Sequence, residues 1–449
     1  MSNFVKFIEE NILYEILAVS WLLFLWKYYL NLRQRDFVTR LTDLPKSVEG
    51  LMTKDIYEKA RIYFLDKLAF NDFESIFSEL CTMVYLLTLC YHRFWMWSVD
   101  TVKYCGLDDT NEILISAICM FIINTTYDII FLPFKIYFTF ILEQKHGFNK
   151  EARKSTFFTP LFFIKDQLLK FVVHEVITIP LLCAVIWIIK NGEDYCFLYL
   201  WIFLIVAALF LMIIYPELIA PLFDKYTPLP NGDLKTKIEA LAASINYPLY
   251  KIFIVENSKR SSHSNAYLYG FYKHKRIVLY DTLVEEYYKP AEGEIDTKGC
   301  TTDEVLAVLA HELGHWNHSH TLKGFILGQL HLLLNIFLYT KLENYKPIFE
   351  AFGFVDVQPT FIGFIIITMY ISNPPNVLFQ YVTNILARRF EFEADKFAKT
   401  LGHGQALKSS LIKLHKDNLS YPLHDKLYSS WHHNHPQVLE RIEAIDKED

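Results

Sequence analysis

The stretch VLAHELGHWNHSH, residues 308–320, places five histidine and glutamate side chains within thirteen positions. Three of them, His311, Glu312 and His315, form an H-E-x-x-H pattern. On a helix, positions i and i+4 lie on one face, so both imidazoles can reach one ion. Zinc accepts imidazole nitrogens at about 2.0–2.1 Å in tetrahedral geometry, and the adjacent glutamate can take a proton from a metal-bound water. The pattern therefore predicts a hydrolytic zinc site; the alternative is a polar helix with solvated histidines.

A third ligand is needed, and the best candidate lies far downstream in the stretch RRFEFEADKFA, residues 388–398. Glu391, Ala394 and Asp395 form an E-x-x-A-D pattern there, on a helix that we expect to continue out of an apolar segment. Glu391 can supply a carboxylate, which gives two histidines, one glutamate and a water around the metal. Asp395, one turn further on the same face, can hold a ligand histidine by its second ring nitrogen. The sequence thus predicts one zinc ion per chain, bound by the two motif histidines and Glu391.

Nearby histidines are the alternative source of the third ligand. His318 lies three residues beyond the motif, and His320 follows closely. The third histidine of the metzincin pattern would fall on Thr321, which excludes that class. We favour Glu391 over His318 because the downstream pattern supplies both a ligand and the group that holds a ligand. His318 and His320 are then expected to be solvated or supporting groups, and Glu393 a surface carboxylate.

The elements around the motif can be predicted from residue patterns. The stretch 301–321 begins with a Thr/Asp N-cap signal and continues as a helix. Upstream, residues 250–256, 265–271 and 276–281 are rich in β-branched and aromatic side chains, which is typical of short strands. The residues KHK at 273–275 are a plausible turn that would join the last two strands into a hairpin.

The composition points to a membrane protein. Of the 449 residues, 52% are hydrophobic, and the mean hydropathy is +0.18. Seven apolar runs are long enough to cross a bilayer core of about 30 Å, at residues 12–32, 76–98, 112–140, 168–190, 196–219, 323–341 and 360–384. A net charge of −6 without a basic block argues against a nucleic-acid partner. The seven cysteines form no CxxC pair, so neither a disulfide framework nor a cysteine zinc site is indicated.

Loop charges predict the orientation of the chain. The loops after the first and third runs are rich in lysine and arginine, whereas the loop after the fourth is short and acidic. By the positive-inside rule the N-terminus faces the lumen, and both large polar regions face the cytosol. We divide the chain into five spans with their loops at 1–219, a cytosolic metalloprotease region at 220–322, two spans at 323–384 and a cytosolic tail at 385–449.

Some apolar runs contain ionisable side chains. Asp128 lies in the third run and Glu175 in the fourth, and each costs several kcal/mol if it faces lipid. Pairing between helices would satisfy them, but we favour placement of both beside a water-filled space within the bundle.

Longer stretches extend the motif: TTDEVLAVLA before HELGH, ARRFEFEAD after the last apolar run, KRSSHSNAYLYGFYKHKRIVLYDTL, and WHHNHPQVLERI near the end. Together they resemble the type I CAAX prenyl proteases, integral-membrane zinc endopeptidases of the endoplasmic reticulum and inner nuclear membrane. The resemblance covers nearly the whole chain. It implies an all-α polytopic fold of seven transmembrane helices around a large hydrophilic chamber, with a cytosolic α+β metalloprotease domain of the gluzincin type.

Carried over position by position, the resemblance implies that His311, His315 and Glu391 are the zinc ligands and Glu312 is the catalytic glutamate. The sequence departs from the family at Glu393, where many members have glutamine. We expect little effect from this departure, because the extra carboxylate lies off the ligand face.

Three more roles follow from the resemblance. The HSNAY stretch places the substrate-facing asparagine at Asn265, where a strand edge could pair with an extended peptide. The HPQVLER stretch places an active-site histidine at His435 and an active-site arginine at Arg441. In that interpretation His435 donates a hydrogen bond to the developing oxyanion, and Arg441 orients acidic groups around the metal. The alternatives are that Asn265 is an ordinary turn residue, that His435 is a helix N-terminal residue and that Arg441 is a surface charge.

The resemblance also implies a substrate: a protein in the bilayer that ends in a prenylated C-a-a-X sequence and is cut after the lipidated cysteine. Some members cut certain substrates a second time upstream, and the residues above do not decide between one cut and two. A membrane quality-control or translocon-clearing zinc protease without a prenyl requirement is the alternative within the same class. A receptor or transporter with a structural zinc is a further alternative, but such a site is normally closed by four protein ligands and does not need Glu312.

Overall fold

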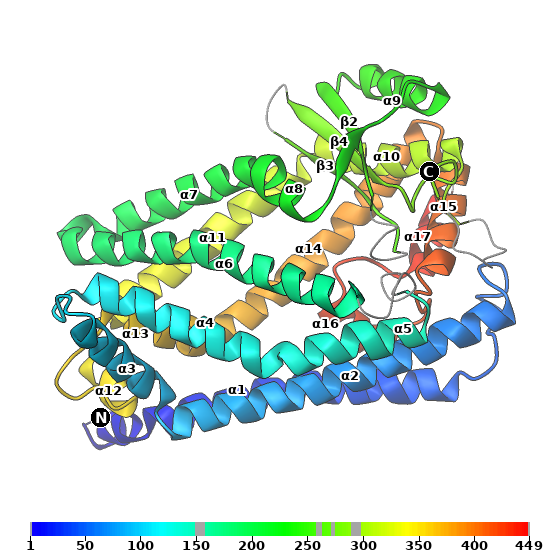
Figure 1. Cartoon of the computed structure of the whole chain (residues 1–449). Helices are drawn as coiled ribbons and strands as arrows, with labels where there is room; N and C mark the ends of the chain where they lie inside the picture. Colours follow the sequence, from blue (N-terminus) through cyan, green and yellow to red (C-terminus); the bar gives the residue numbers. More distant parts are fainter. Residues whose placement is uncertain (1, 149–157, 257–262, 271–273, 289–297, 448–449) are drawn as a thin grey trace.

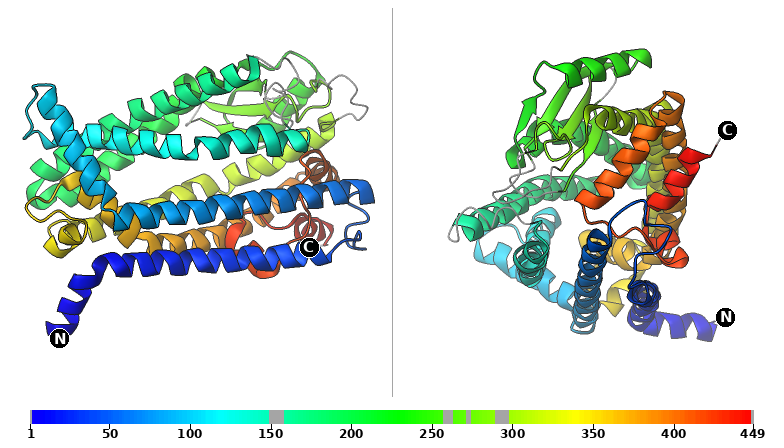
Figure 2. Two further views of the ribbon diagram at one scale, coloured as in Figure 1. Left: turned by 60° about the horizontal axis from the view of Figure 1, so that its bottom comes forward. Right: turned by 90° about the vertical axis from the view of Figure 1, so that its right-hand side faces the viewer.

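The computed structural model describes residues 2–148, 158–256, 263–270, 274–288 and 298–447. Long helices run side by side, and a small sheet with several shorter helices sits at one end of them (Figure 1). The N-terminus lies at the opposite end, as the side view in Figure 2 also shows. The long helices are α1 Ser2–Arg40, α2 Lys54–Leu87, α4 Glu112–Tyr137, α6 Phe158–Asn191, α7 Cys196–Ile214, α11 His320–Leu342 and α14 Asn373–Thr400.

Within the described residues, five helical segments are long and apolar enough to cross a membrane: Glu9–Arg40, Glu112–Lys145, Phe163–Asn191, Glu193–Phe223 and His320–Leu342. Two bent pairs raise the number to seven if each pair is one span. These pairs are α2 with α3 (Cys90–Tyr104), bent by 65°, and Thr360–Ile371 with α14, bent by 53°. The seven predicted runs fall on these segments.

The two bends were not predicted, and each has a local cause. Leu89 adopts the left-handed conformation with φ of 51°, which ends α2 and redirects the chain into α3. At the second bend, Pro374 and Pro375 occupy the first turn of α14. Proline fits a first helical turn but has no N–H to continue the preceding helix. The second predicted run, 76–98, is therefore two helices and not one.

Shorter segments complete the helical part. They are the π-helical turns Phe138–Leu142, Tyr215–Ile219 and Ile366–Ile371, the 3-10 turn Glu193–Tyr195, and α5 Glu143–Lys145, α8 Ala220–Phe223, α12 Lys346–Ala351 and α13 Thr360–Ile365. Large apolar side chains, among them Leu22, Val176 and Leu330, are exposed on the long helices. Such an exposed surface is expected where helices face lipid.

The sheet has four strands in the order β1-β2-β4-β3: β1 Tyr226–Pro228, β2 Leu249–Val255, β3 Ala266–Tyr269 and β4 Lys275–Tyr280. β2 pairs with β4 in parallel, whereas the outer strands β1 and β3 pair antiparallel to their neighbours. The predicted pairing of the last two strands is confirmed; of the predicted turn 273–275, residue 273 lies outside the described part of the chain and Lys275 already belongs to β4. β1 and α9 (Asp233–Ser244), which joins it to β2, were not predicted.

The HELGH motif lies on α10, Thr302–Asn317, which starts with the predicted cap: Thr301 and Glu304 form a reciprocal capping box. α10 packs against α14 at very short range. A Cβ atom added to Gly314 would lie 2.9 Å from the Cα of Ala394. Glycine in the one motif and alanine in the other thus let the two backbones approach closely.

The chain end packs onto this pair of helices. α15 Gly404–Asp417, α16 Lys426–His432 and α17 Val438–Asp446 follow α14 at the sheet end of the molecule (Figure 1). Leu309 and Leu313 of α10 and Ile442 of α17 belong to one buried apolar cluster. This core fixes the tail against the helix that carries the motif.

The ionisable groups within the spans behave differently from one another. Asp128 lines a cavity of about 700 Å³ between helices and pairs there with Lys135 at 2.6 Å. Glu175 does not lie on that wall. It is buried, and its Oε1 accepts a hydrogen bond from Asn124 Nδ2 at 2.8 Å. Asp128 thus lies beside a polar interhelical space, as predicted, whereas Glu175 does not line it; Glu175 is paired through Oε1 only, and its buried Oε2 has no hydrogen-bond partner among the described residues.

Candidate metal centre

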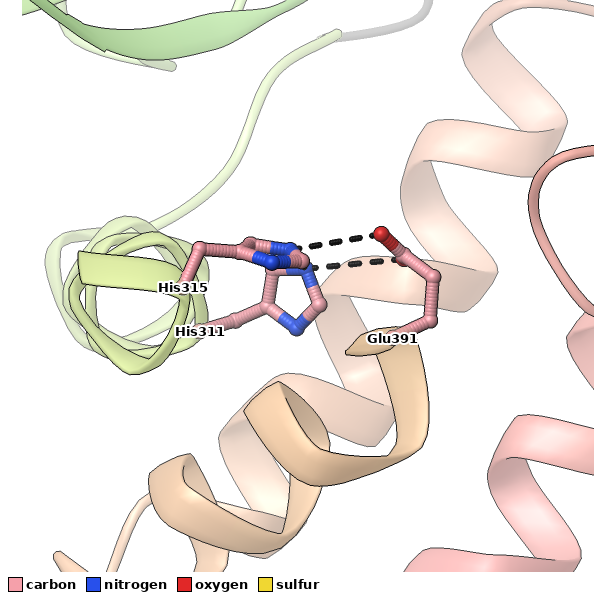
Figure 3. A group of neighbouring side chains, drawn as sticks. All are labelled: His311, His315 and Glu391. Carbon is pink, nitrogen blue, oxygen red and sulfur yellow. Dashed lines mark hydrogen bonds and ion pairs between the residues drawn. The ribbon is translucent and has the colours of Figure 1, made fainter. Parts of the chain in front are cut away.

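Three side chains from two helices converge at the sheet end of the bundle. His311 and His315 lie one turn apart on α10, and Glu391 reaches them from α14 (Figure 3). The two Nε2 atoms are 3.2 Å apart, Glu391 Oε1 lies 3.2 Å from His315 Nε2, and Glu391 Oε2 lies 3.6 Å from His311 Nε2. Two imidazole nitrogens and a carboxylate aimed at one point can hold a metal ion. His318 is not part of this group among the described residues.

Asp395 holds the first histidine, as predicted from its spacing. Its Oδ1 lies 2.8 Å from His311 Nδ1, so His311 donates through Nδ1 and turns Nε2 toward Glu391. Arg441 binds Asp395 through two hydrogen bonds, Nε to Oδ2 at 2.8 Å and Nη2 to Oδ1 at 2.6 Å. All these groups are buried. The paired fork fixes the carboxylate plane, which in turn fixes the tautomer and orientation of His311.

The tail brings two more groups to Glu391. Arg441 Nη1 lies 3.2 Å from Glu391 Oε2, so a single guanidinium contacts both carboxylates of the E-x-x-A-D pattern. His435 Nδ1 lies 2.9 Å from the same oxygen, while its side chain is 60% exposed. Glu391 Oε2 is buried and makes no hydrogen bond of normal geometry despite these neighbours. The interpretation of Arg441 as a surface charge is therefore wrong, whereas His435 combines contact with exposure.

The second histidine has a different support. His315 Nδ1 lies 2.9 Å from His320 Nδ1, and His320 Nε2 lies 2.9 Å from Glu393 Oε2. An ionised carboxylate only accepts, so His320 donates through Nε2 and its Nδ1 accepts from His315. This leaves the Nε2 lone pair of His315 directed at Glu391. Glu393 is on the surface as predicted, with 48% exposure, but it supports a ligand through His320.

Glu312 lies between the two histidines in the sequence of α10. Its side chain is half-buried, so it is partly in contact with protein and partly accessible to water. Burial raises the pKa of the Glu312 carboxyl, against the opposing effect of His311 and His315. A carboxyl whose pKa lies above its ordinary value gains basicity as an acceptor of a water proton.

Asn265 lies at the start of β3, the outer strand of the sheet, and its side chain is exposed. Its Oδ1 accepts from the N–H of Ala266 at 2.8 Å, and its carbonyl accepts from the N–H of Tyr280 at 3.0 Å. The other edge of β3 has no strand partner among the described residues. The structure therefore places Asn265 at an open edge, without a contact to the metal ligands.

Comparisons with known proteins match nearly the whole chain. Residues 34–225 match the family model described as CAAX prenyl protease N-terminal, five membrane helices, and residues 228–449 match peptidase family M48. The chain belongs to the CAAX prenyl protease branch of peptidase family M48. It is 43% identical to a CAAX prenyl protease 1 homolog of Mus musculus over 97% of this chain and 96% of the relative. It is 41% identical to an Arabidopsis thaliana homolog over 95% and 96%.

A solved structure agrees with this membership. The crystal structure of S. mikatae Ste24p superposes with a TM-score of 0.84 at 34% identity, covering 96% of this chain and 98% of that one. The resemblance predicted from the sequence is confirmed, and the chain is a membrane-embedded metalloprotease. A receptor or transporter with a structural zinc is thereby excluded.

Sequence reasoning gave His320 no more than a solvated or supporting role and Glu393 none. His320 is five residues after His315, and in one continuous helix these two residues would not lie on the same face. The helix is not continuous: α10 ends, and Ser319 takes a left-handed conformation with φ of 54° before α11 begins. This turn brings the His320 ring back to His315. The only feature of the sequence that pointed to a role for Glu393 was its position two residues after Glu391.

Proposed function

We propose that this protein is a zinc endopeptidase that removes the aaX tripeptide from prenylated proteins ending in C-a-a-X. The observation that carries the proposal is the convergence of His311, His315 and Glu391 with Glu312 beside them. The names of the relatives, CAAX prenyl protease 1 homologs, supply the substrate class.

Zinc fits the donor set. Ligand atoms bound at 2.0–2.1 Å in tetrahedral geometry are separated by about 3.3 Å; the two Nε2 atoms are 3.2 Å apart, and each lies 3.2–3.6 Å from one oxygen of Glu391, Oε1 for His315 and Oε2 for His311. The buried Glu391 Oε2, which has no good hydrogen bond, gains a cationic partner when a metal is present. Three protein ligands leave a fourth position open, as catalytic zinc sites require.

Bound zinc would polarise a water and the scissile carbonyl. Glu312 takes the proton of the attacking water and returns it to the leaving amine. His435, exposed at the edge of the site, donates a hydrogen bond to the carbonyl oxygen as negative charge develops there. Arg441 and Asp395 keep His311 and Glu391 in place during these steps.

The substrate backbone is proposed to add to the open edge of β3 at Asn265. Seven spans then surround a hydrophilic chamber, of which the polar cavity beside Asp128 is one part. The loop charges favour a lumenal N-terminus with residues 220–322 and 385–449 in the cytosol, in the membrane of the endoplasmic reticulum or the inner nuclear membrane.

The test uses the purified full chain in detergent or nanodiscs with a farnesylated C-a-a-X peptide. We expect one zinc per chain, release of a tripeptide by mass, and loss of release on chelation or in Glu312→Ala with zinc retained. An unmodified peptide cut as fast as the farnesylated one would instead favour a quality-control protease. Release that survives Glu312→Ala would overturn the proposed chemistry.

A further inference from the structure

A second cavity, of about 540 Å³, lies directly beside the metal centre. His435, whose Nδ1 is 2.9 Å from Glu391 Oε2, forms part of its wall. Most of the rest of the wall comes from α2 and from the tail, α15 to α17. Asn71 of α2 lines both this cavity and the polar cavity that contains Asp128. The two cavities are thus neighbours along α2.

The open edge of β3 leads into the same cavity. His263, two residues before Asn265, lies on the wall. The neighbouring Ser264 N–H donates to Asn418 Oδ1 of the tail at 3.1 Å, and Asn418 also lines the cavity. An extended peptide paired with β3 therefore meets the mouth of this cavity where the strand begins.

The charge of the cavity is unusual. No aspartate or glutamate is found among its described wall residues, and Lys67 is the one lysine or arginine. The Lys67 ammonium lies 4.9 Å from the centre of the Tyr63 ring, and no described carboxylate lies within ion-pair distance of it. Burial lowers the pKa of His415 to about 4 and that of His424 to about 3, so these wall histidines are neutral at pH 7. Lys67 is thus the one lysine or arginine of the described wall, and the carboxylate that acts on it, Glu143, does so from beyond ion-pair distance while accepting a hydrogen bond from the Tyr63 hydroxyl at 2.6 Å.

Part of the remaining wall is apolar. Phe64 and Leu68 of α2 and the tail residues Tyr421, Pro422 and Val438 line it, and the Phe64 ring stacks on Tyr421 with centroids 5.5 Å apart. A sphere of 540 Å³ is about 10 Å across, and three extended residues span about 10 Å. A tripeptide therefore matches the cavity in length, its aliphatic side chains can contact the apolar part of the wall, and its one negative charge can pair with Lys67.

We propose that this cavity holds the aaX tripeptide of the substrate and that Lys67 binds the carboxylate at the end of the substrate chain. The inference rests on the proposed function and extends it, because it explains how a cut three residues from a free C-terminus is favoured. Lys67 would hold the terminal carboxylate of the substrate at one end of the cavity, and the metal centre lies at the other end. The length of the cavity then places the bond three residues from the C-terminus at the metal centre. An interior peptide segment lacks the carboxylate and gains nothing from Lys67.

The test compares two farnesylated peptides that differ only at the C-terminus, one a free acid and one an amide. In the wild-type chain we expect kcat/KM for the acid to exceed that for the amide by about ten- to a hundredfold, the range for a hydrogen bond to a charged group. Lys67→Gln should lower kcat/KM for the acid by a similar factor, mainly through KM, and leave the amide unchanged. Lys67→Arg should restore most of the preference.

Lys59→Gln is the matched control. Lys59 lies two turns earlier on α2, is exposed and pairs with Asp55 at 2.7 Å, so its loss should change neither peptide. Equal effects of Lys67→Gln on acid and amide, or no effect on either, would overturn the inference. If Lys67→Gln does not fold, inhibition of the wild-type chain by the free tripeptide and by its amide decides the question, and equal inhibition refutes the role of Lys67. Failure of the wild type to cut the farnesylated acid at all would instead refute the proposed function.

Discussion

Replacing His320 by phenylalanine is expected to weaken zinc binding while leaving the fold intact. The His320 ring is buried and stacks on Phe390 with centroids 4.1 Å apart and planes at 9°. Phenylalanine keeps this stacking and fills the same space, but it cannot accept a hydrogen bond. The His315 Nδ1–H then loses its partner at 2.9 Å in a place that water does not reach freely.

The size of the effect follows from the lost acceptor. An unsatisfied buried donor costs about 1–3 kcal/mol, which corresponds to a five- to about 150-fold increase in the zinc dissociation constant. Loss of the partner of a metal-binding histidine typically weakens metal binding by about 10–100-fold. We therefore expect a rise of about tenfold or more for His320→Phe, and a smaller one for Glu393→Ala, which removes only the next group in the chain.

The assay is competition for zinc between the protein and a chelator of known affinity. Two conservative variants serve as controls. His320→Asn places an amide oxygen near the position of Nδ1 and should recover part of the affinity, although it loses the stacking. Glu393→Gln keeps an oxygen acceptor for His320 and should bind zinc within about twofold of wild type. The absorption bands of the cobalt-substituted protein should shift in His320→Phe and not in Glu393→Gln.

Two results would refute a role for the His320 hydrogen bond: zinc binding by His320→Phe as tight as wild type, or zinc binding by His320→Asn no tighter than by His320→Phe. The first result would mean that the rotamer of His315 is set by α10 alone. The second would mean that packing of the His320 ring, and not its hydrogen bond, supports the site. Thermal unfolding of the metal-free proteins separates a general loss of stability from a change confined to the metal centre.

Three further predictions concern the surroundings of the site. Gly314→Ala should lower the free energy of unfolding by about 1–3 kcal/mol through overpacking, because the new Cβ meets the Ala394 backbone at 2.9 Å. The thermal midpoint and the zinc affinity should fall together. Glu304→Ala removes a capping box and should lower the free energy of unfolding by about 1 kcal/mol, and with it the thermal midpoint, while zinc affinity stays unchanged. Buried His424 has its pKa lowered to about 3, so its neutral form stabilises the fold above pH 6.5 and this stability is lost as the pH falls through 6.5 toward 3. Hydrogen-exchange protection factors in α15 to α17, which are corrected for the intrinsic exchange rate at each pH, should therefore fall at pH 5 relative to pH 7.5, and His424→Gln should reduce the fall.

Much of this centre could be predicted from the sequence because its residues are spaced so that they lie on one face of a helix. His311 and His315 are one turn apart, as are Glu391 and Asp395, and each pair lies on one face of a regular helix. The prediction that Asp395 holds a ligand histidine needed only this spacing and the requirement that a metal-binding imidazole be oriented. The meeting of the two helices was not visible in the spacing, although Gly314 and Ala394 are the residues that permit it.

What escaped prediction depends on breaks in regular structure. The left-handed residues Leu89 and Ser319 redirect the chain, and neither is a glycine or asparagine that would signal such a turn. β1 is three residues long and carries no periodic pattern. Glu175 and its hydrogen-bond partner Asn124 lie on different helices, so the pattern within either helix does not predict their contact. Local patterns predict elements, but contacts between elements decide which polar groups are paired.

The metal centre also depends on the membrane helices in a way that the domain limits do not suggest. α14 has 28 residues and is about 42 Å long; its first part belongs to a candidate span and its later part carries Glu391 and Asp395. α11, another candidate span, begins at His320 itself, which supports His315. A ligand and the support of another ligand are thus fixed to helices that the bilayer holds. Removing the spans would release Glu391 and His320 together, so the catalytic region cut away from its bundle should bind zinc far more weakly than the full chain in the same chelator competition.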